Sequence, residues 1–588
     1  MNHVSFFFSD LFVLLSADSR LSPSIVQSVK KQKIIATSTP SRWNTLEFKF
    51  YYLVVVVAVS YMFATAIKIS RADNQNYIYY QNLLSDGWIF GRKVDNSDSQ
   101  YRFFRDNFWL LSILAVSHLC LRIVFQFFIS TRRNLYDLVF GSLVMIALYG
   151  CNFLKIFVHL LINYFIGRLF IYLDNKNDSN KIFNSTFTYK SVGILILWIY
   201  GISTLFVNDK FRSVRFGSML SFLSPLDSFK GIIERWDVFF NFVLLKMLSF
   251  NLDYYNRMTE INNNLKLNTS KIDKSRIEIE NPELLTNERL RTNAPLDLSQ
   301  YSFSNYLSYV LYTPLFIAGP IITFNDFTYQ SFHRLPTLNL KFVIRYAIRF
   351  VFCILTMELI LHYIYVVAIA KRKAWINDTP FEISMIGFFN LNIIWLKLLM
   401  PWRFFRLWAL LDGIDPPENM LRCVCNNYSA LAFWRAWHRS FNKWILRYIY
   451  IPLGGSKSRI LTSLAVFTFV AIWHDIQLRL LFWGWMIVLF LIPEILCNVY
   501  LKPLIQNHRW YRFICGIGAV VNIWLMMIAN LFGFCLGNEG TKKLLSDMFT
   551  SIYGVQFTII STICLFIAVQ VMFELREHEK RHGVDVKC

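Results

Sequence analysis

Long apolar runs recur along the whole chain and are separated by shorter polar or basic segments. The first run covers residues 50–69, and the last covers residues 556–573. Runs of this kind suit membrane-crossing helices, because about 20 helical residues span a hydrocarbon core of about 30 Å. Their number predicts an all-α polytopic membrane protein with about eleven spans, accompanied by re-entrant and interfacial helices.

The composition supports this fold class. The chain has 588 residues, of which 55% are hydrophobic and only 17% are charged, whereas soluble chains carry about 25% charged residues. The formal net charge is +22, from 60 Lys and Arg against 38 Asp and Glu. Because the basic residues are spread between apolar runs, we interpret them as facing anionic lipid headgroups and exclude a nucleic-acid partner.

The apolar runs form one predicted membrane domain, residues 49–573. A polar N-terminal tail, residues 1–48, precedes it, and a short charged tail, residues 574–588, follows it. Residues 259–296 are the most polar of the chain and predict an exposed loop within the domain. Residues 401–485 combine Trp and Arg with a polar break in an apolar run, and we expect the active site there.

Residues 433–450 carry a concentration of Trp and Arg. On one continuous helix, Trp434 would belong to an aromatic stripe and Arg435 to the basic face opposite. His438 would lie at the border and share a face with Asn442. The pattern is typical of an interfacial helix, so His438 is interpreted either as part of an aromatic belt or as a functional residue.

His474 follows a short apolar run. Ile460 to Trp473 is 14 residues, or about 21 Å of helix against a core of about 30 Å. His474 is therefore expected inside the membrane, where the polar step from His474 to Gln477 needs protein neighbours or a water-filled cavity. An ionisable residue at that depth indicates a functional site, with a structural histidine at a helix end as the alternative.

The chemistry that fits such a histidine is acyl transfer. A neutral buried imidazole can accept the proton of an alcohol or amine that attacks a thioester. The sequence has no Gly-x-Ser-x-Gly motif, so a serine nucleophile is not indicated. No set of His, Asp and Glu has the sequence spacing of a metal site.

Several motifs resemble the membrane-bound O-acyltransferase (MBOAT) superfamily. They are Trp434-Arg435-x-Trp437-His438, Arg447–Gly455, Trp473-His474-Asp475 and Trp483-Gly484-Trp485. Residues 91–107 and 410–415 further resemble the fungal glycerol-uptake (Gup) proteins, which remodel GPI anchors. The resemblance covers nearly the whole chain after the N-terminal tail and implies a multi-helix membrane core with an internal tunnel or chamber.

The resemblance also implies an activity and a location. It implies an O-acyltransferase that moves a long or very long acyl chain from acyl-CoA to a hydroxyl of a lyso-GPI anchor lipid. The superfamily histidine falls on His474 as general base, and the second catalytic position falls on His438, where another residue type is usual. The expected location is the endoplasmic reticulum membrane, with the plasma membrane as a second site, and transfer needs no cofactor.

Five further residues are candidates for binding. Trp434, Arg435, Asn442 and Asp475 are predicted to contact acyl-CoA or the lipid acceptor. Cys423 is a candidate axial ligand for haem, because the resembling hedgehog acyltransferase holds a haem through a cysteine at a similar distance before its second catalytic position. A plain interfacial thiol is the alternative.

Three other functions stay open at this point. They are a protein acyltransferase of the hedgehog-acyltransferase type, a glycerol transporter or regulator of glycerol uptake, and a non-catalytic scaffold. A transporter should show an internal repeat or polar residues spread over several spans. Here the polar residues concentrate between residues 434 and 475, which favours the enzyme.

Overall fold

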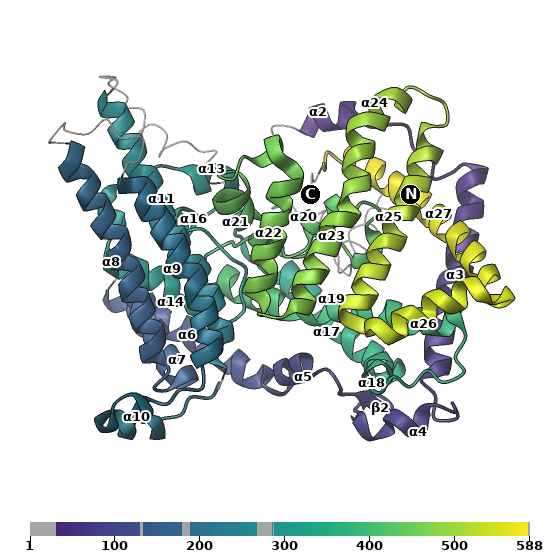
Figure 1. Cartoon of the computed structure of the whole chain (residues 1–588), viewed down its shortest axis with the longest axis horizontal. Coiled ribbons are helices and arrows are strands. Elements are labelled where there is room, and N and C mark those ends of the chain that lie inside the picture. Colours follow the sequence, from purple (N-terminus) through teal and green to yellow (C-terminus); the bar gives the residue numbers. More distant parts are fainter. Residues whose placement is uncertain are drawn as a thin grey trace.

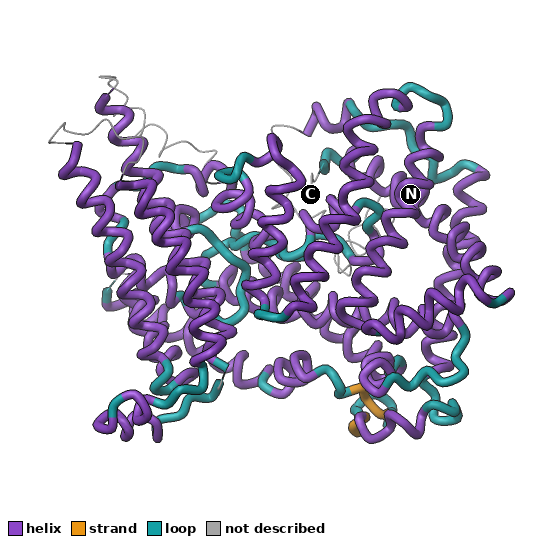
Figure 2. Tube along the Cα trace, viewed as in Figure 1, coloured by secondary structure: helices purple, strands orange, loops and turns teal. Residues whose placement is uncertain are grey.

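The computed structural model of the protein describes residues 31–129, 133–178, 189–233, 235–266, 285 and 287–585. The regular structure of these residues is helical, apart from one antiparallel hairpin of strands β1 (Leu84–Asp86) and β2 (Lys93–Asp95) (Figure 2). Most of the predicted N-terminal tail, the middle of the predicted polar loop and the last three residues of the chain lie outside the described residues.

Nine helices in the described residues are long and apolar enough to cross a membrane. They are α3 (Leu46–Ile69), α6 (Phe108–Phe128), α8 (Phe153–Asp178), α9 (Tyr189–Phe211), α19 (Pro380–Leu411), α22 (Arg459–His474) taken together with the helical turn from Gly455, α23 (Leu478–Leu496), α25 (Tyr511–Asn530) and α27 (Ile552–Arg581). A tenth span is formed if α17 (Leu340–Tyr363) and α18 (Val366–Arg372), which meet at a bend of 53°, are taken together. The all-α polytopic fold is confirmed.

Two more helices explain why about eleven spans were expected from hydropathy. α7 (Arg133–Tyr149) has only 17 residues. α11 (Trp236–Lys266) has 31 residues, and its apolar middle, from Phe240 to Phe250, is enclosed by protein. A helix buried in a protein core is as apolar as one that faces lipid, so hydropathy alone counts both.

The remaining helices are short and connect or flank the long ones. They are α2 (Lys31–Ala36), α4 (Tyr77–Tyr80), α5 (Ser99–Asp106), α10 (Phe216–Met219), α13 (Glu288–Asn293), α14 (Phe303–Leu311), α15 (Thr313–Phe316), α16 (Phe324–Phe332), α20 (Ala430–Ala436), α21 (Arg439–Ile445), α24 (Lys502–Ile505) and α26 (Gly537–Thr550). Figure 1 shows α4, α5, α10 and the hairpin at one edge of the molecule and α2 and α24 at the opposite edge. The long helices run between these edges.

The predicted re-entrant segment is two short helices, α14 and α15, joined at Tyr312. Both are buried in protein. Pro314 lies in the first turn of α15, where a missing N–H group costs nothing. The Lys246 side chain on α11 donates a hydrogen bond to the carbonyl oxygen of Val310, 3.1 Å away, and so satisfies a backbone acceptor that the break leaves open.

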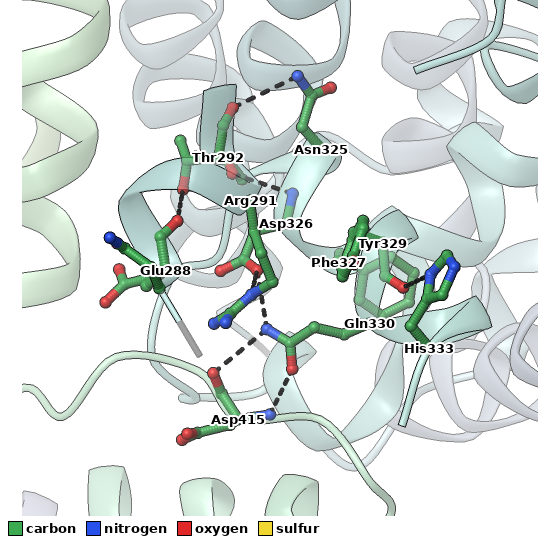
Figure 3. A network of polar contacts seen from close by, with 12 residues as sticks. Glu288, Arg291, Thr292, Asn325, Asp326, Phe327, Tyr329, Gln330, His333 and Asp415 are labelled. Atoms are coloured by element: carbon green, nitrogen blue, oxygen red, sulfur yellow. Dashed lines mark hydrogen bonds and ion pairs between the residues drawn. The ribbon is translucent and has the colours of Figure 1, made fainter. Parts of the chain in front are cut away.

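A polar network anchors the end of the predicted exposed loop (Figure 3). Arg291 on α13 is buried, and its Nε lies 2.6 Å from a carboxylate oxygen of Asp326 on α16. Gln330 donates to the same oxygen at 2.9 Å and accepts from the backbone N–H of Asp415 at 2.7 Å. The loop therefore ends inside the protein before residue 296.

The C-terminal residues continue the last helix. α27 runs on to Arg581, through the point at residue 574 where a charged tail was expected. Glu574 is buried and pairs with Arg581 at 2.6 Å, and Glu579 is buried and pairs with Arg422 at 3.4 Å. These ion pairs hold the charged end of the helix against the protein, which sequence polarity alone did not reveal.

Candidate functional site

Residues 433–450 do not form the single helix expected from their pattern. α20 ends at Ala436, α21 begins at Arg439, and His438 between them has φ 43° and ψ 51°, in the left-handed region. Asn419 accounts for the break, because its backbone oxygen accepts from the N–H of Arg439 at 3.0 Å and its side-chain oxygen from the N–H of Ser440 at 3.1 Å. Because Asn419 accepts from these two N–H groups, they need no acceptor from a preceding helical turn, and a new helix can begin after His438.

His438 is enclosed by aromatic rings. Its ring stacks on Trp402 of α19 at 4.5 Å, and only 6% of the residue is exposed. Its Nε2 has no hydrogen-bond partner among the residues that the structure describes. Burial, with a smaller contribution from His474, lowers the pKa of His438 well below its usual range. The imidazole is therefore neutral at physiological pH.

Asn442 and Trp434, two of the predicted binding residues, connect α21 and α20 across the break at His438. The side-chain amide of Asn442 donates to the carbonyl oxygen of Trp434 at 2.8 Å, across the gap between α21 and α20. The Trp434 ring meets Phe467 and Trp483 edge-on, with centroids 5.6 and 5.5 Å away. Arg435 is exposed on the surface of α20. The predicted shared face of His438 and Asn442 is absent, because the helix that would carry it is broken.

His474 is the last residue of α22. The apolar span that it ends begins at Gly455 and has 20 residues, so it is longer than the run from Ile460 suggested. Asp475 then has extended backbone, with φ −171° and ψ 145°. His474 therefore lies at the end of a full-length span, where its side chain is exposed to a cavity.

The structure brings His474 and His438 to the same pair of aromatic rings. The Phe441 ring lies 5.1 Å from His438 and 6.5 Å from His474, between centroids. The Trp473 ring lies 6.3 Å from His438 and 4.9 Å from His474. The two histidines thus share one site, with His438 buried and His474 open to the cavity.

The cavity beside His474 is polar and partly open to solvent, with about 340 Å³ of empty space when its open side is included. We call it the polar cavity. Its walls come from the end of α9, the start of α11 and the end of α22, and its polar lining residues are Asn208, Asp209, Arg235, Asp237, Asn241, His474 and Asp475. The residues from α9 and α11 were not predicted from the sequence, because they lie more than 200 positions before His474 and only the folded chain brings them together.

Carboxylates outnumber cations in the wall of the polar cavity. Among the described residues, Asp209, Asp237 and Asp475 line it together with the guanidinium of Arg235. Arg212 also pairs with two of these carboxylates, at 3.4 Å from Asp209 and 3.7 Å from Asp237, so three carboxylates face two guanidinium groups. Arg235 is already paired with Asp237, with nitrogen and oxygen 2.8 Å apart. The carboxylates can accept hydrogen bonds from hydroxyl groups, and the guanidinium groups can donate to hydroxyl oxygens. The excess of carboxylates does not favour a phosphate-rich ligand.

An apolar groove joins the polar cavity. It is an open groove between α9 and α22, with about 740 Å³ of empty space when its open side is included, and is lined by Ile202, Leu461, Leu464, Ala465, Thr468, Phe469 and Ile472. Ile472 lines both the groove and the polar cavity. Leu461 is 71% exposed, so the groove is open on the side of the molecule that would face lipid. An acyl chain in this groove would end near His474.

Asn241 fixes the end of α22. Its side-chain amide donates to the carbonyl oxygen of Trp473 at 2.6 Å, and the indole N–H of Trp473 donates back to the carbonyl oxygen of Asn241 at 2.9 Å. The pair ties the residue before His474 to α11. It therefore determines how the His474 ring enters the polar cavity.

Replacing Asn241 with Leu is expected to lower kcat for acyl transfer about fivefold, with little change in KM. The variant removes one of two hydrogen bonds that orient the backbone at Trp473, and such a bond contributes about 1 kcal/mol. Steady-state transfer assays on purified protein would check this. Asn392→Leu, which removes another half-buried helix asparagine on α19, should leave kcat unchanged. Equal kcat for Asn241→Leu and wild type would contradict the positioning role.

The surroundings of Cys423 do not fit a haem ligand. Its side chain is half-buried, packs against the main hydrophobic core and shares a hydrogen bond with the thiol of Cys425. Cys423 lines neither the polar cavity nor the apolar groove. These contacts favour the alternative, a thiol with a packing role.

Comparison with known proteins decides the family. The family model of MBOAT, the membrane-bound O-acyltransferase family, matches residues 193–538, which include α9, α11, both histidines and the polar cavity. The chain belongs to the MBOAT family. Its MBOAT region therefore contains the complete candidate site.

Relatives of the enzyme cover its whole length. It is 56% identical to the membrane-bound O-acyltransferase GUP1 of Saccharomyces cerevisiae over 99% of both chains. It is 53% identical to the GUP1 protein of Candida tropicalis, over 98% of this chain and 95% of the relative. A more distant similarity, 29% identity over 30% of this chain and 37% of the relative, connects it with the mouse protein-cysteine N-palmitoyltransferase HHAT. The protein is a membrane acyltransferase close to the fungal Gup proteins.

Proposed function

We propose that this MBOAT enzyme transfers a long or very long acyl chain from acyl-CoA to a hydroxyl of a lyso-GPI anchor lipid in the endoplasmic reticulum membrane, with the plasma membrane as a second location. The observation that carries the proposal is the junction at His474. A polar cavity of about 340 Å³ meets an apolar groove of about 740 Å³ there. A lipid with a hydroxylated headgroup needs both environments on either side of the reacting hydroxyl.

In the proposed reaction His474 is the general base. Its imidazole takes the proton of the acceptor hydroxyl while the hydroxyl oxygen attacks the thioester carbonyl carbon. The carbon–sulfur bond then breaks, and the imidazolium returns the proton to the departing CoA thiolate. His438, neutral and with an unpartnered Nε2, orients the acceptor across Phe441 and Trp473.

The donor and the acceptor are proposed to reach His474 by different routes. Three carboxylates line the polar cavity, so the phosphates of acyl-CoA are unfavourable there. Arg435 is exposed on α20, does not line the polar cavity, and is the proposed contact for the CoA phosphates. The acceptor headgroup is proposed to bind in the polar cavity, beside Asp475.

A second candidate function is the acylation of a protein amine. It is favoured by the similarity to mouse HHAT, which is named a protein-cysteine N-palmitoyltransferase. The same base and the same donor would serve both reactions, since an amine and an alcohol attack a thioester alike. The apolar groove at His474 favours the lipid acceptor.

An acceptor panel tests these functions. Purified protein in lipid nanodiscs would receive radiolabelled C16 or C26 acyl-CoA with lyso-GPI, lysophosphatidylinositol or a peptide with an N-terminal cysteine. We expect alkali-labile ester on the lipids and none on the peptide. Label on the peptide alone would favour the protein acyltransferase. No transfer, together with glycerol flux in proteoliposomes, would favour the transporter.

A further inference from the structure

Asn208 is a buried amide in the wall of the polar cavity. It lies near the end of α9, is 5% exposed and lines the cavity that His474 faces. Its Nδ2 has no hydrogen-bond partner within the described part of the chain. A buried donor left without a partner is costly and rare in folded proteins, so this nitrogen calls for an explanation.

His159, which is neither of the two histidines of the candidate site, holds the Asn208 side chain in place. His159 on α8 lies with its Nε2 3.2 Å from Oδ1 of Asn208 and its Nδ1 2.8 Å from the hydroxyl of Tyr200. A carbonyl oxygen only accepts, so Nε2 of His159 carries the proton and the Tyr200 hydroxyl donates to Nδ1. This chain of hydrogen bonds fixes Oδ1 toward His159 and leaves Nδ2 as the free donor of the amide.

The rest of this arrangement is rigid. The His159 ring also packs against Phe240 of α11, with centroids 4.9 Å apart. Phe240 is completely buried. The amide of Asn208 is therefore oriented before any ligand arrives, which is what a substrate-binding donor requires.

We propose that Asn208 is a further substrate-binding residue, whose amide donates a hydrogen bond to an oxygen of the lipid acceptor beside the hydroxyl that reacts at His474. His159 and Tyr200 act through it as positioning residues. The inference rests on the proposed acyl transfer to a lipid and adds the contact that holds the headgroup.

The chemistry of the polar cavity indicates the class of headgroup. Asp209 and Asp475 each use one carboxylate oxygen on a protein partner, Arg212 and Gln477. Their second oxygens can accept hydrogen bonds from hydroxyls, and Asn208 offers a donor for a hydroxyl oxygen. A headgroup rich in hydroxyls, such as an inositol or sugar ring, satisfies both kinds of group. A choline headgroup has no hydroxyl to donate and should bind less well.

The test compares wild type with Asn208→Ala, using palmitoyl-CoA as donor and lysophosphatidylinositol or lysophosphatidylcholine as acceptor. We expect wild type to prefer lysophosphatidylinositol. In Asn208→Ala the KM for lysophosphatidylinositol should rise about tenfold, and the KM for palmitoyl-CoA should stay at the wild-type value. The preference for lysophosphatidylinositol over lysophosphatidylcholine should therefore become smaller. Unchanged KM values would overturn the inference. A rise only in the KM for palmitoyl-CoA would also overturn it, because the amide would then serve the donor.

Two further variants keep the test decisive. Tyr200→Phe removes only the hydroxyl that orients His159 and should raise the KM for lysophosphatidylinositol about threefold, and an unchanged value would count against the inference even if Asn208→Ala fails to fold. Asn163→Ala removes another buried amide with an unpartnered nitrogen, outside the polar cavity, and should leave both KM values unchanged. Loss of transfer in His474→Ala with normal kinetics in Asn208→Ala would sink this inference alone. Full transfer in His474→Ala would sink the proposed function itself.

Discussion

His474→Ala is expected to lower kcat for acyl transfer by a factor of about 100 to 10,000, the range that a positioned general base contributes. The side chain is the only imidazole in the described wall of the polar cavity. No other described group there combines neutrality with the ability to take a proton from a hydroxyl. His474→Gln, which keeps a polar side chain of similar size, should lose a similar factor.

Steady-state transfer with radiolabelled palmitoyl-CoA and lysophosphatidylinositol measures this effect. His508→Ala removes an exposed histidine beyond α24 and is the matched control, with kcat expected at the wild-type value. Thermal unfolding in nanodiscs should show that His474→Ala folds, because the His474 side chain is exposed to the cavity. A folded His474→Ala protein with wild-type kcat would exclude a base at this position.

Asp412→Ala is expected to destabilise the protein by about 3–5 kcal/mol, the effect of removing one partner from a buried ion-pair cluster. Asp412 follows α19 and accepts from Arg122 on α6, from Arg133 on α7 at 2.9 Å and from the hydroxyl of Tyr312 at 2.5 Å. Removing the carboxylate would leave two half-buried guanidinium groups without their shared partner.

The measurement for Asp412→Ala is the yield and thermal unfolding of purified protein. Asp86→Ala is the control, because Asp86 pairs with Lys93 on the surface and such pairs contribute about 0–1 kcal/mol. Equal unfolding temperatures for Asp412→Ala and wild type would contradict the account.

His118 and Asp137 also approach Asp412, with ligand atoms within 4.8 Å. The two arginines already neutralise these carboxylates, so we interpret the cluster as ion pairs.

Much of the fold could be predicted because the apolar runs are long and distinct. α3, α6 and α27 appear close to where hydropathy placed them. α11 was counted as a span although protein surrounds it, since burial in protein and burial in lipid select the same side chains. The helical end of the chain after residue 574 was missed because its charges are hidden by ion pairs that depend on tertiary contacts.

The candidate site was only partly predictable. The polar break after α22 allowed His474 and Asp475 to be predicted as site residues, and both line the polar cavity. The break at His438 could not be anticipated, because it depends on hydrogen bonds from Asn419 in a distant loop. Asn208 and Asn241 gave no signal in the sequence, since each looks like an ordinary polar residue at the margin of an apolar run.

The most direct test of the central claim, that His474 acts as the base in the polar cavity, is chemical rescue. Transfer of radiolabelled palmitate to lysophosphatidylinositol would be measured for His474→Ala with and without added imidazole. In His474→Ala the removed side chain leaves a space of its own size at the wall of the polar cavity, where added imidazole can bind. The account predicts almost no transfer without imidazole and a rate that rises with its concentration. Transfer at the wild-type rate without imidazole would contradict it.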